Sequence, residues 1–290
     1  MKRLMLYLSV LVCAVLLATA SVFVQERLRP QLGDRDEAPQ RITDPENLPT
    51  TYLNQNRLHK LIVNNDDLGV YNELSQRGAI REEFNYGSFR LIVVDQESIG
   101  GRAAMQALPL AARDEQNLIV LNGYVLDTTN AEPLSKAPPA DLRQTQMNVA
   151  RKNFSRPGKG MYIVQFAGPI QDEWLNSLEQ TGADVISYIP NNAYVVRADS
   201  DAAMRLIQLK DEQSFVQWLG DYEPAFRIRQ SLVDARNFDA DQFVNVTVQF
   251  VASDETKRKV SALRQSARRF FSDAQVLKYH NVTMNIPLSQ

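Results

Sequence analysis

The sequence predicts an α+β fold built from repeated βαββαβ units, and three observations support this prediction. Residues 78–95 and 182–199 align without a gap, each beginning with Gly-Ala after an amphipathic helix and ending on Asp. The similarity resumes in the next helical segment, at residues 103–105 and 202–204. Short runs of β-branched and aromatic residues separate these helices. A repeat of this length indicates that one supersecondary unit occurs at least twice.

The amino-terminal residues predict export from the cytoplasm. A basic start precedes an uncharged apolar run over residues 4–24, and Ala18 and Ala20 supply the small side chains that a signal peptidase requires. We therefore expect a signal peptide over residues 1–24 and a secreted protein. Because about 20 apolar residues also suffice to cross a bilayer, a retained anchor is the alternative and the only membrane contact that we expect.

Composition argues against several classes of site. The single cysteine, Cys13, lies inside the apolar segment, so the exported part has no thiol for a disulfide, a thiolate metal site or a cysteine nucleophile. A net charge of −2 gives no electrostatic reason to bind nucleic acid. We therefore expect neither a nucleic-acid partner nor a cofactor.

Changes in composition divide the rest of the chain. Residues 25–57 are rich in Pro, Asp, Glu and Arg and contain too little apolar surface to fold, so we expect a disordered tether. Breaks in the apolar pattern, the first of them rich in proline, predict linkers over residues 128–159 and 230–242. The three units between these segments are residues 58–127, 160–229 and 243–290.

The second unit has the clearest pattern. Residues 161–166 predict a strand, and Pro169 is placed to begin a helix that Gly182 ends. Two strands follow around a Pro-Asn-Asn turn, whose residues tolerate the backbone angles of a tight turn. A second helix over residues 202–209 and a fourth strand over residues 215–219 complete the order βαββαβ.

This order has a specific three-dimensional solution. Two βαβ halves with right-handed crossovers interleave into a four-stranded antiparallel sheet, with both helices on one face and the other face open. The same order is predicted in the first unit, from strands over residues 60–63, 79–84, 89–94 and 118–125 and helices over residues 68–76 and 102–108. We therefore expect ferredoxin-like units in tandem.

The third unit repeats only the front of the pattern. Its first strand includes residues 248–250, which repeat residues 164–166, and a helix over residues 255–271 and two further strands follow. Neither a second helix nor a fourth strand is predicted before residue 290, so we expect this unit to be truncated. A half unit leaves a strand edge unpaired, which favours the front part of a longer protein.

Candidate catalytic and metal-binding residues are few and scattered. His59 and His280 lie in different units, without cysteines or paired carboxylates at metal-ligand spacing, so both are interpreted as surface histidines. The acidic pairs at residues 66–67 and 82–83 are interpreted as capping groups and as a solvent-facing part of a strand. We predict no catalytic residue and no metal site.

The second unit also carries a family resemblance. Residues 161–166 (MYIVQF), 188–197 (YIPNNAYVVR) and 216–226 (VQWLGDYEPAF) resemble the amino-terminal propeptide or inhibitor domains of bacterial secreted subtilisin-like serine peptidases. The resemblance covers the second unit best and is weaker for the third. None of the motifs that carry the peptidase's own Asp, His and Ser occurs in the 290 residues.

The resemblance implies a binding role. In that family the open sheet face packs on helices of the catalytic domain and aids its folding, and the segment after the last strand lies in the substrate cleft. Trp218, Tyr222 and Phe226 are therefore candidate partner anchors, because buried aromatic residues carry much of the energy of protein contacts. The alternative is that these aromatic residues fill the unit's own core.

The expected partner is a subtilisin-like peptidase domain, in the same chain or in another. The chain would then be the non-catalytic amino-terminal region of an exported peptidase, acting as folding assistant, inhibitor or spacer. A free-standing secreted inhibitor or interaction protein with repeated modules is the alternative. Peptidase motifs in an open reading frame beyond Gln290 would favour the first hypothesis over the second.

Overall fold

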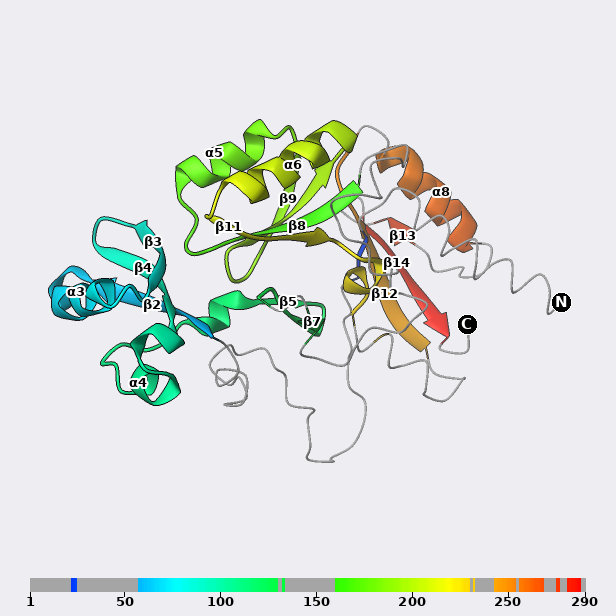
Figure 1. Cartoon of the computed structure of the whole chain (residues 1–290). Helices are drawn as coiled ribbons and strands as arrows, with labels where there is room; N and C mark the ends of the chain where they lie inside the picture. The colour runs from blue at the N-terminus through cyan, green and yellow to red at the C-terminus, as the bar shows by residue number, and fades with distance from the viewer. Residues whose placement is uncertain are drawn as a thin grey trace, which may run out of the picture.

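The structure is a computed structural model that describes residues 22–24, 57–129, 132–133, 160–229, 232, 243–253, 256–268, 275–276 and 281–287. These residues form an α+β fold of several small antiparallel sheets with helices packed against them (Figure 1). Most of the predicted signal peptide, tether and linkers lies outside the described residues, as do the candidate cleavage residues Ala18 and Ala20.

The second unit forms a four-stranded sheet. Its elements are β8 (Gly160–Phe166), α5 (Asp172–Gln180), β9 (Asp184–Ile189), β10 (Ala193–Ala198), α6 (Ser200–Glu212) and β11 (Val216–Asp221). The sheet has the order β11-β8-β10-β9, and all neighbouring strands are antiparallel. Both helices lie on the same face of this sheet (Figure 1). The second unit therefore has the predicted element order.

The aligned repeat has the same local structure in the first and second units. Gly78 and Gly182, which follow the first helix of each unit, have φ of 62° and 80°, a conformation that favours glycine. At the other end of the repeat, the Asp95 carboxylate accepts a hydrogen bond from a backbone N–H two residues later. Asp199 accepts one from the Ala202 amide and caps α6. The repeat thus conserves backbone geometry as well as sequence.

The first unit has a three-stranded sheet with the order β2-β4-β3. Its strands and helices are β2 (Leu58–Asn64), α3 (Leu68–Gln76), β3 (Ile80–Asn85), β4 (Phe89–Asp95) and α4 (Arg102–Gln106). Its 3-10 turns are η2 (Asn65–Asp67), η3 (Gln96–Ile99) and η4 (Asp114–Asn117). At the edge of β2, a single bridge from Leu61 to Ala112 stands where the fourth strand is predicted.

The strand predicted over residues 118–125 is wrong. The segment is a hairpin of β5 (Leu118–Leu121) and β6 (Tyr124–Asp127), which joins β7 (Glu132–Pro133) in a separate sheet. Asn122 and Gly123 form its turn with φ of 49° and 94°. An Asn-Gly pair between apolar runs is a strong signal for a hairpin turn, and it overrides the continuous apolar pattern here.

The third unit comprises β12 (Phe243–Phe250), α8 (Thr256–Arg268), β13 (Gln275–Val276) and β14 (Asn281–Pro287). Its antiparallel sheet has the order β1-β12-β14-β13. The outer strand β1 (Val22–Val24) comes from the other end of the chain and pairs with β12, with Val22 opposite Phe250. This edge of β12 is therefore paired, in contrast to the open edge expected of a truncated unit.

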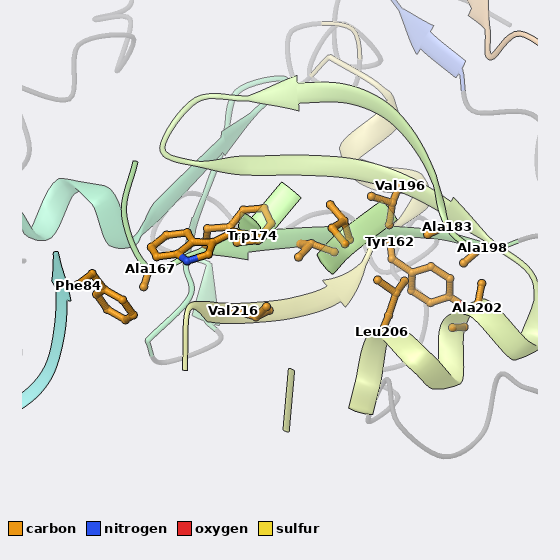
Figure 2. Packing of buried hydrophobic residues seen from close by; sticks show 14 of the residues in the cluster. Phe84, Tyr162, Ala167, Trp174, Ala183, Val196, Ala198, Ala202, Leu206 and Val216 are labelled. Atoms are coloured by element: carbon orange, nitrogen blue, oxygen red, sulfur yellow. The ribbon is translucent and has the colours of Figure 1, made fainter. Parts of the chain in front are cut away.

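The first and second units share one hydrophobic core. The Trp174 indole of α5 stacks on the Phe166 ring of β8. It also meets Phe84 of β3 edge-on, with 5.3 Å between the Phe84 and Trp174 ring centroids (Figure 2). Nearby, the Tyr86 hydroxyl donates a hydrogen bond to the Pro169 carbonyl at 2.7 Å. The two units therefore pack against each other through apolar and polar contacts.

We expect Trp174→Ala to lower the free energy of unfolding by about 3–5 kcal/mol, because the deletion leaves a cavity beneath Phe84 and Phe215. Urea denaturation followed by circular dichroism measures the change. Met204→Ala is the control, since this α6 side chain is 50% exposed, and its expected effect is within about 0.5 kcal/mol. Equal losses in the two variants would contradict the shared core.

Candidate functional site

The helix-free face of the second unit is covered by the β5–β6 hairpin. Met161 and Ile163 of β8 and Val195 of β10 lie on this face. They form one hydrophobic cluster with the hairpin residues Ile119, Leu121, Tyr124 and Leu126. Ile163 and Val195 are completely buried. The face that was expected to be open is thus covered by another part of the same chain.

The three candidate anchors lie at the margin of this covered face. Trp218 is half-buried on β11. Tyr222, just before the turn η7 (Pro224–Arg227), is 1% exposed, and Phe226, within that turn, is 7% exposed. The Phe226 ring meets Tyr124 of the hairpin edge-on at 5.8 Å between centroids. All three residues contact the same cluster. Their binding to a partner stays a prediction, and any such partner meets them already packed within the chain.

A glycine allows Trp218 to lie flat on its strand. A Cβ atom at Gly220 would overlap the indole ring of Trp218, so a larger residue there would displace the ring. Behind this strand end, the Arg227 guanidinium lies 5.4 Å from the centre of the Tyr222 ring and donates a hydrogen bond to the Tyr222 carbonyl at 2.8 Å. Burial raises the pKa of the Tyr222 phenol and lowers the pKa of the Arg227 guanidinium.

Gln165 holds the segments next to the β5–β6 hairpin by hydrogen bonds at the centre of the covered face. This β8 side chain is fully buried, and its Oε1 atom accepts hydrogen bonds from Thr128 Oγ1 at 2.6 Å and Gln217 Nε2 at 3.0 Å. Its Nε2 atom donates to the Gln116 and Asn191 carbonyls, each at 3.0 Å. The amide therefore makes all four of the hydrogen bonds it can form, to segments before, within and after the linker.

Two asparagines form hydrogen bonds at the two ends of the β5–β6 hairpin. Asn191, in the β9–β10 turn, has φ of 67°, and its Nδ2 atom donates to the carbonyls of Glu115 and Leu118, each at 2.9 Å. At the hairpin turn, Asn122 Nδ2 donates to the Phe226 carbonyl at 2.6 Å. The hairpin is thus held by directional bonds as well as by apolar contact.

A second buried polar group lies beside η4 and corrects the expectation for His59. His59 is 4% exposed, so its predicted surface position is wrong. Its Nδ1 atom lies 2.6 Å from Asp114 Oδ2, and its Nε2 atom lies 3.1 Å from Gln96 Oε1. The other Asp114 oxygen accepts a hydrogen bond from the Lys60 amide at 3.0 Å. Asp114 therefore ties η4 to β2.

Lys60 is the most unusual titratable group of this region. Its side chain is 3% exposed, and its Nζ atom has no hydrogen-bond partner among the described residues. Burial lowers its pKa to about 7, although Asp114, Glu82 and Glu115 act in the opposite direction. No local pattern in the sequence indicates this burial, because Asp114, which binds the Lys60 amide, lies 54 positions later along the chain.

The other candidate positions show no cluster. Asp66 and Asp67 lie in η2 before α3, and Glu83 on β3 pairs with Arg90 at 3.0 Å. Within the part of the chain that the structure describes, no group of three His, Cys, Asp or Glu side chains could hold a metal ion. In that same part, no helix is long and apolar enough to cross a membrane. His280 lies outside the described residues.

Comparison with known proteins places most of the hairpin and the second unit's sheet within one family model. A family model described as a domain of unknown function (DUF8729) matches residues 120–223. The matched range begins in β5, includes β6 and ends just after β11, so it contains most of the hairpin and the whole sheet beneath it. No curated protein and no solved structure matches the chain.

We expect Gln165→Ala to lower the free energy of unfolding by about 1–3 kcal/mol, because it leaves buried hydrogen-bonding groups of Gln116 and Asn191 without their partner. Chemical denaturation measures this loss, and amide hydrogen exchange should become faster in residues 118–127. Gln208→Ala removes an exposed glutamine of α6 and serves as the control. Unchanged exchange in the hairpin would show that Gln165 does not hold the cover.

Proposed function

We propose that this chain is the non-catalytic amino-terminal region of an exported subtilisin-like serine peptidase, and that its units bind protein. The observation that carries the proposal is the second unit's βαββαβ order with the strand order β11-β8-β10-β9. Ferredoxin-like domains have this topology. The propeptide or inhibitor domains that residues 161–226 resemble have the same fold, so topology and sequence support the same proposal.

We further propose that the first and third units are shortened copies of the same ferredoxin-like unit. The orders β2-β4-β3 and β12-β14-β13 each repeat the β8-β10-β9 part of the second sheet. In each copy, the position of β11 is filled differently. The bridge at Ala112 lies beside β2, and β1 lies beside β12.

The third unit offers the sheet face that fits a peptidase domain in this proposal. In the second unit, the hairpin already covers the face that a propeptide domain presents to its peptidase. In the third unit, Val246 and Val282 are buried on the side of α8. The opposite face has a polar ladder of exposed or half-buried residues, formed by Asn245, Thr247, Thr283 and Asn285.

The polar ladder suits a protein surface with backbone groups to satisfy. Its members already bond across the strands, with Thr283 Oγ1 donating to Asn245 Oδ1 at 3.0 Å and Asn245 Nδ2 donating to Asn285 Oδ1 at 3.2 Å. Amide and hydroxyl groups can both donate and accept hydrogen bonds. The ladder residues carry no charge, so we propose recognition by hydrogen bonds to a partner's helix ends or loops rather than by ion pairs.

The full chain of residues 1–290 should slow peptide hydrolysis by a subtilisin at micromolar concentration if this proposal is correct. Asn285→Arg should raise the inhibition constant at least tenfold, a change of about 1.4 kcal/mol, because a long charged side chain would enter the ladder. Asn176→Arg is the matched control, since Asn176 is exposed on α5 of the second unit. Hydrolysis rates at increasing protein concentration measure both effects.

Each outcome of this assay is informative. Hydrolysis that is not slowed at micromolar protein would end the inhibitory version of the proposal. Equal inhibition by the parent chain and Asn285→Arg would place the binding surface away from the ladder. If the chain inhibits and its reading frame is also found to stop at Gln290, the free-standing inhibitor is favoured over the peptidase region.

A further inference from the structure

The Lys60 side chain lies between the first unit and the rest of the chain. Side chains alternate along β2, and Leu61 and Val63 belong to the first unit's own core. Ile62, on the opposite face, packs against the cluster that contains Trp174 of the second unit. Lys60 shares the face of Ile62, so its amine is buried on the side of the strand that meets the second unit.

Charged side chains from three neighbouring elements interact electrostatically with this amine or with the carboxylates around it. Asp114 and Glu115 belong to η4, and Glu82 belongs to β3. Lys210 of α6 acts in turn on Glu82. The Asp114 carboxylate is already engaged by His59 and by the Lys60 backbone amide. The Lys60 amine is thus surrounded by protein but unbonded within the described residues.

The segment beside Lys60 is also the anchor of the hairpin cover. Asp114 and Glu115 lie in η4, which leads directly into β5. The Glu115 carbonyl accepts a hydrogen bond from Asn191 of the second unit, and the Gln116 carbonyl accepts one from Gln165. A change in the charge of Lys60 therefore acts on the segment that holds the hairpin over the sheet.

We propose that Lys60 is a proton-operated latch for the hairpin cover: the neutral amine lets η4 and the β5–β6 hairpin close on the second unit's sheet, and the ammonium ion loosens them. A buried ammonium without hydrogen bonds is costly, and opening returns it to water. The latch does not depend on which protein the chain binds, so its test is independent of the peptidase proposal.

The direction of the pH effect follows from the two states of Lys60. In the closed state its pKa is about 7, and in the open state its pKa returns toward the ordinary 10.5. Between these values the open state binds a proton that the closed state lacks, so rising pH favours closing. The opening equilibrium should fall about tenfold per pH unit from pH 7.5 to 9.5 and level off below pH 6.5.

Hydrogen exchange in residues 118–127 of the full chain tests the latch. Protection factors corrected for the intrinsic exchange rate should rise about tenfold per pH unit from pH 7.5 to 9.5. Lys60→Met, which keeps the apolar stem, should give higher protection at pH 7.5 and abolish this slope. Lys257→Met removes an exposed lysine of α8 and should leave the slope unchanged.

Two results would overturn the latch. One is a level protection factor across pH 7.5 to 9.5 in the parent chain, which does not depend on any variant folding. The other is a slope that persists in Lys60→Met. Because the readout is hairpin protection and not protease inhibition, a chain that fails to inhibit subtilisin leaves this test intact.

Discussion

One buried side-chain amide positions the hairpin over the sheet of the second unit. Gln165 lies on the helix-free face of the second unit, where burial without hydrogen bonds would be costly. Its four partners come from different segments. They are Gln116 in η4, Thr128 just after β6, Asn191 in the β9–β10 turn and Gln217 on β11. An amide with four partners defines one geometry, so it sets where the hairpin lies on the apolar face.

Local signals made much of the fold predictable. Gly182 and Asp199 mark where α5 ends and α6 begins, and both roles depend on a few neighbouring residues. The burial of His59 and Lys60 was not predictable in this way, because the covering residue Asp114 lies 55 positions after His59. The hairpin does have a local signal, the Asn122-Gly123 turn, but the apolar runs on both sides of it also fit one continuous strand.

The candidate anchors show a related ambiguity. An aromatic residue on a strand end has the same sequence pattern whether it meets a partner or another part of its own chain. Tyr222 and Phe226 contact the hairpin here, which argues that their first task is to close the chain's own core. A partner that used this face would have to replace both the apolar contacts and the bonds made by Asn122 and Asn191.

The pairing of β1 with β12 joins segments from opposite ends of the chain in one sheet. During synthesis, Val22–Val24 emerges long before its partner strand Phe243–Phe250, so this sheet edge is among the last contacts that the chain can complete. These three residues also lie at the end of the predicted signal peptide, residues 1–24. Removal of that segment would therefore also remove the outer strand of the third unit's sheet and leave this edge of β12 unpaired.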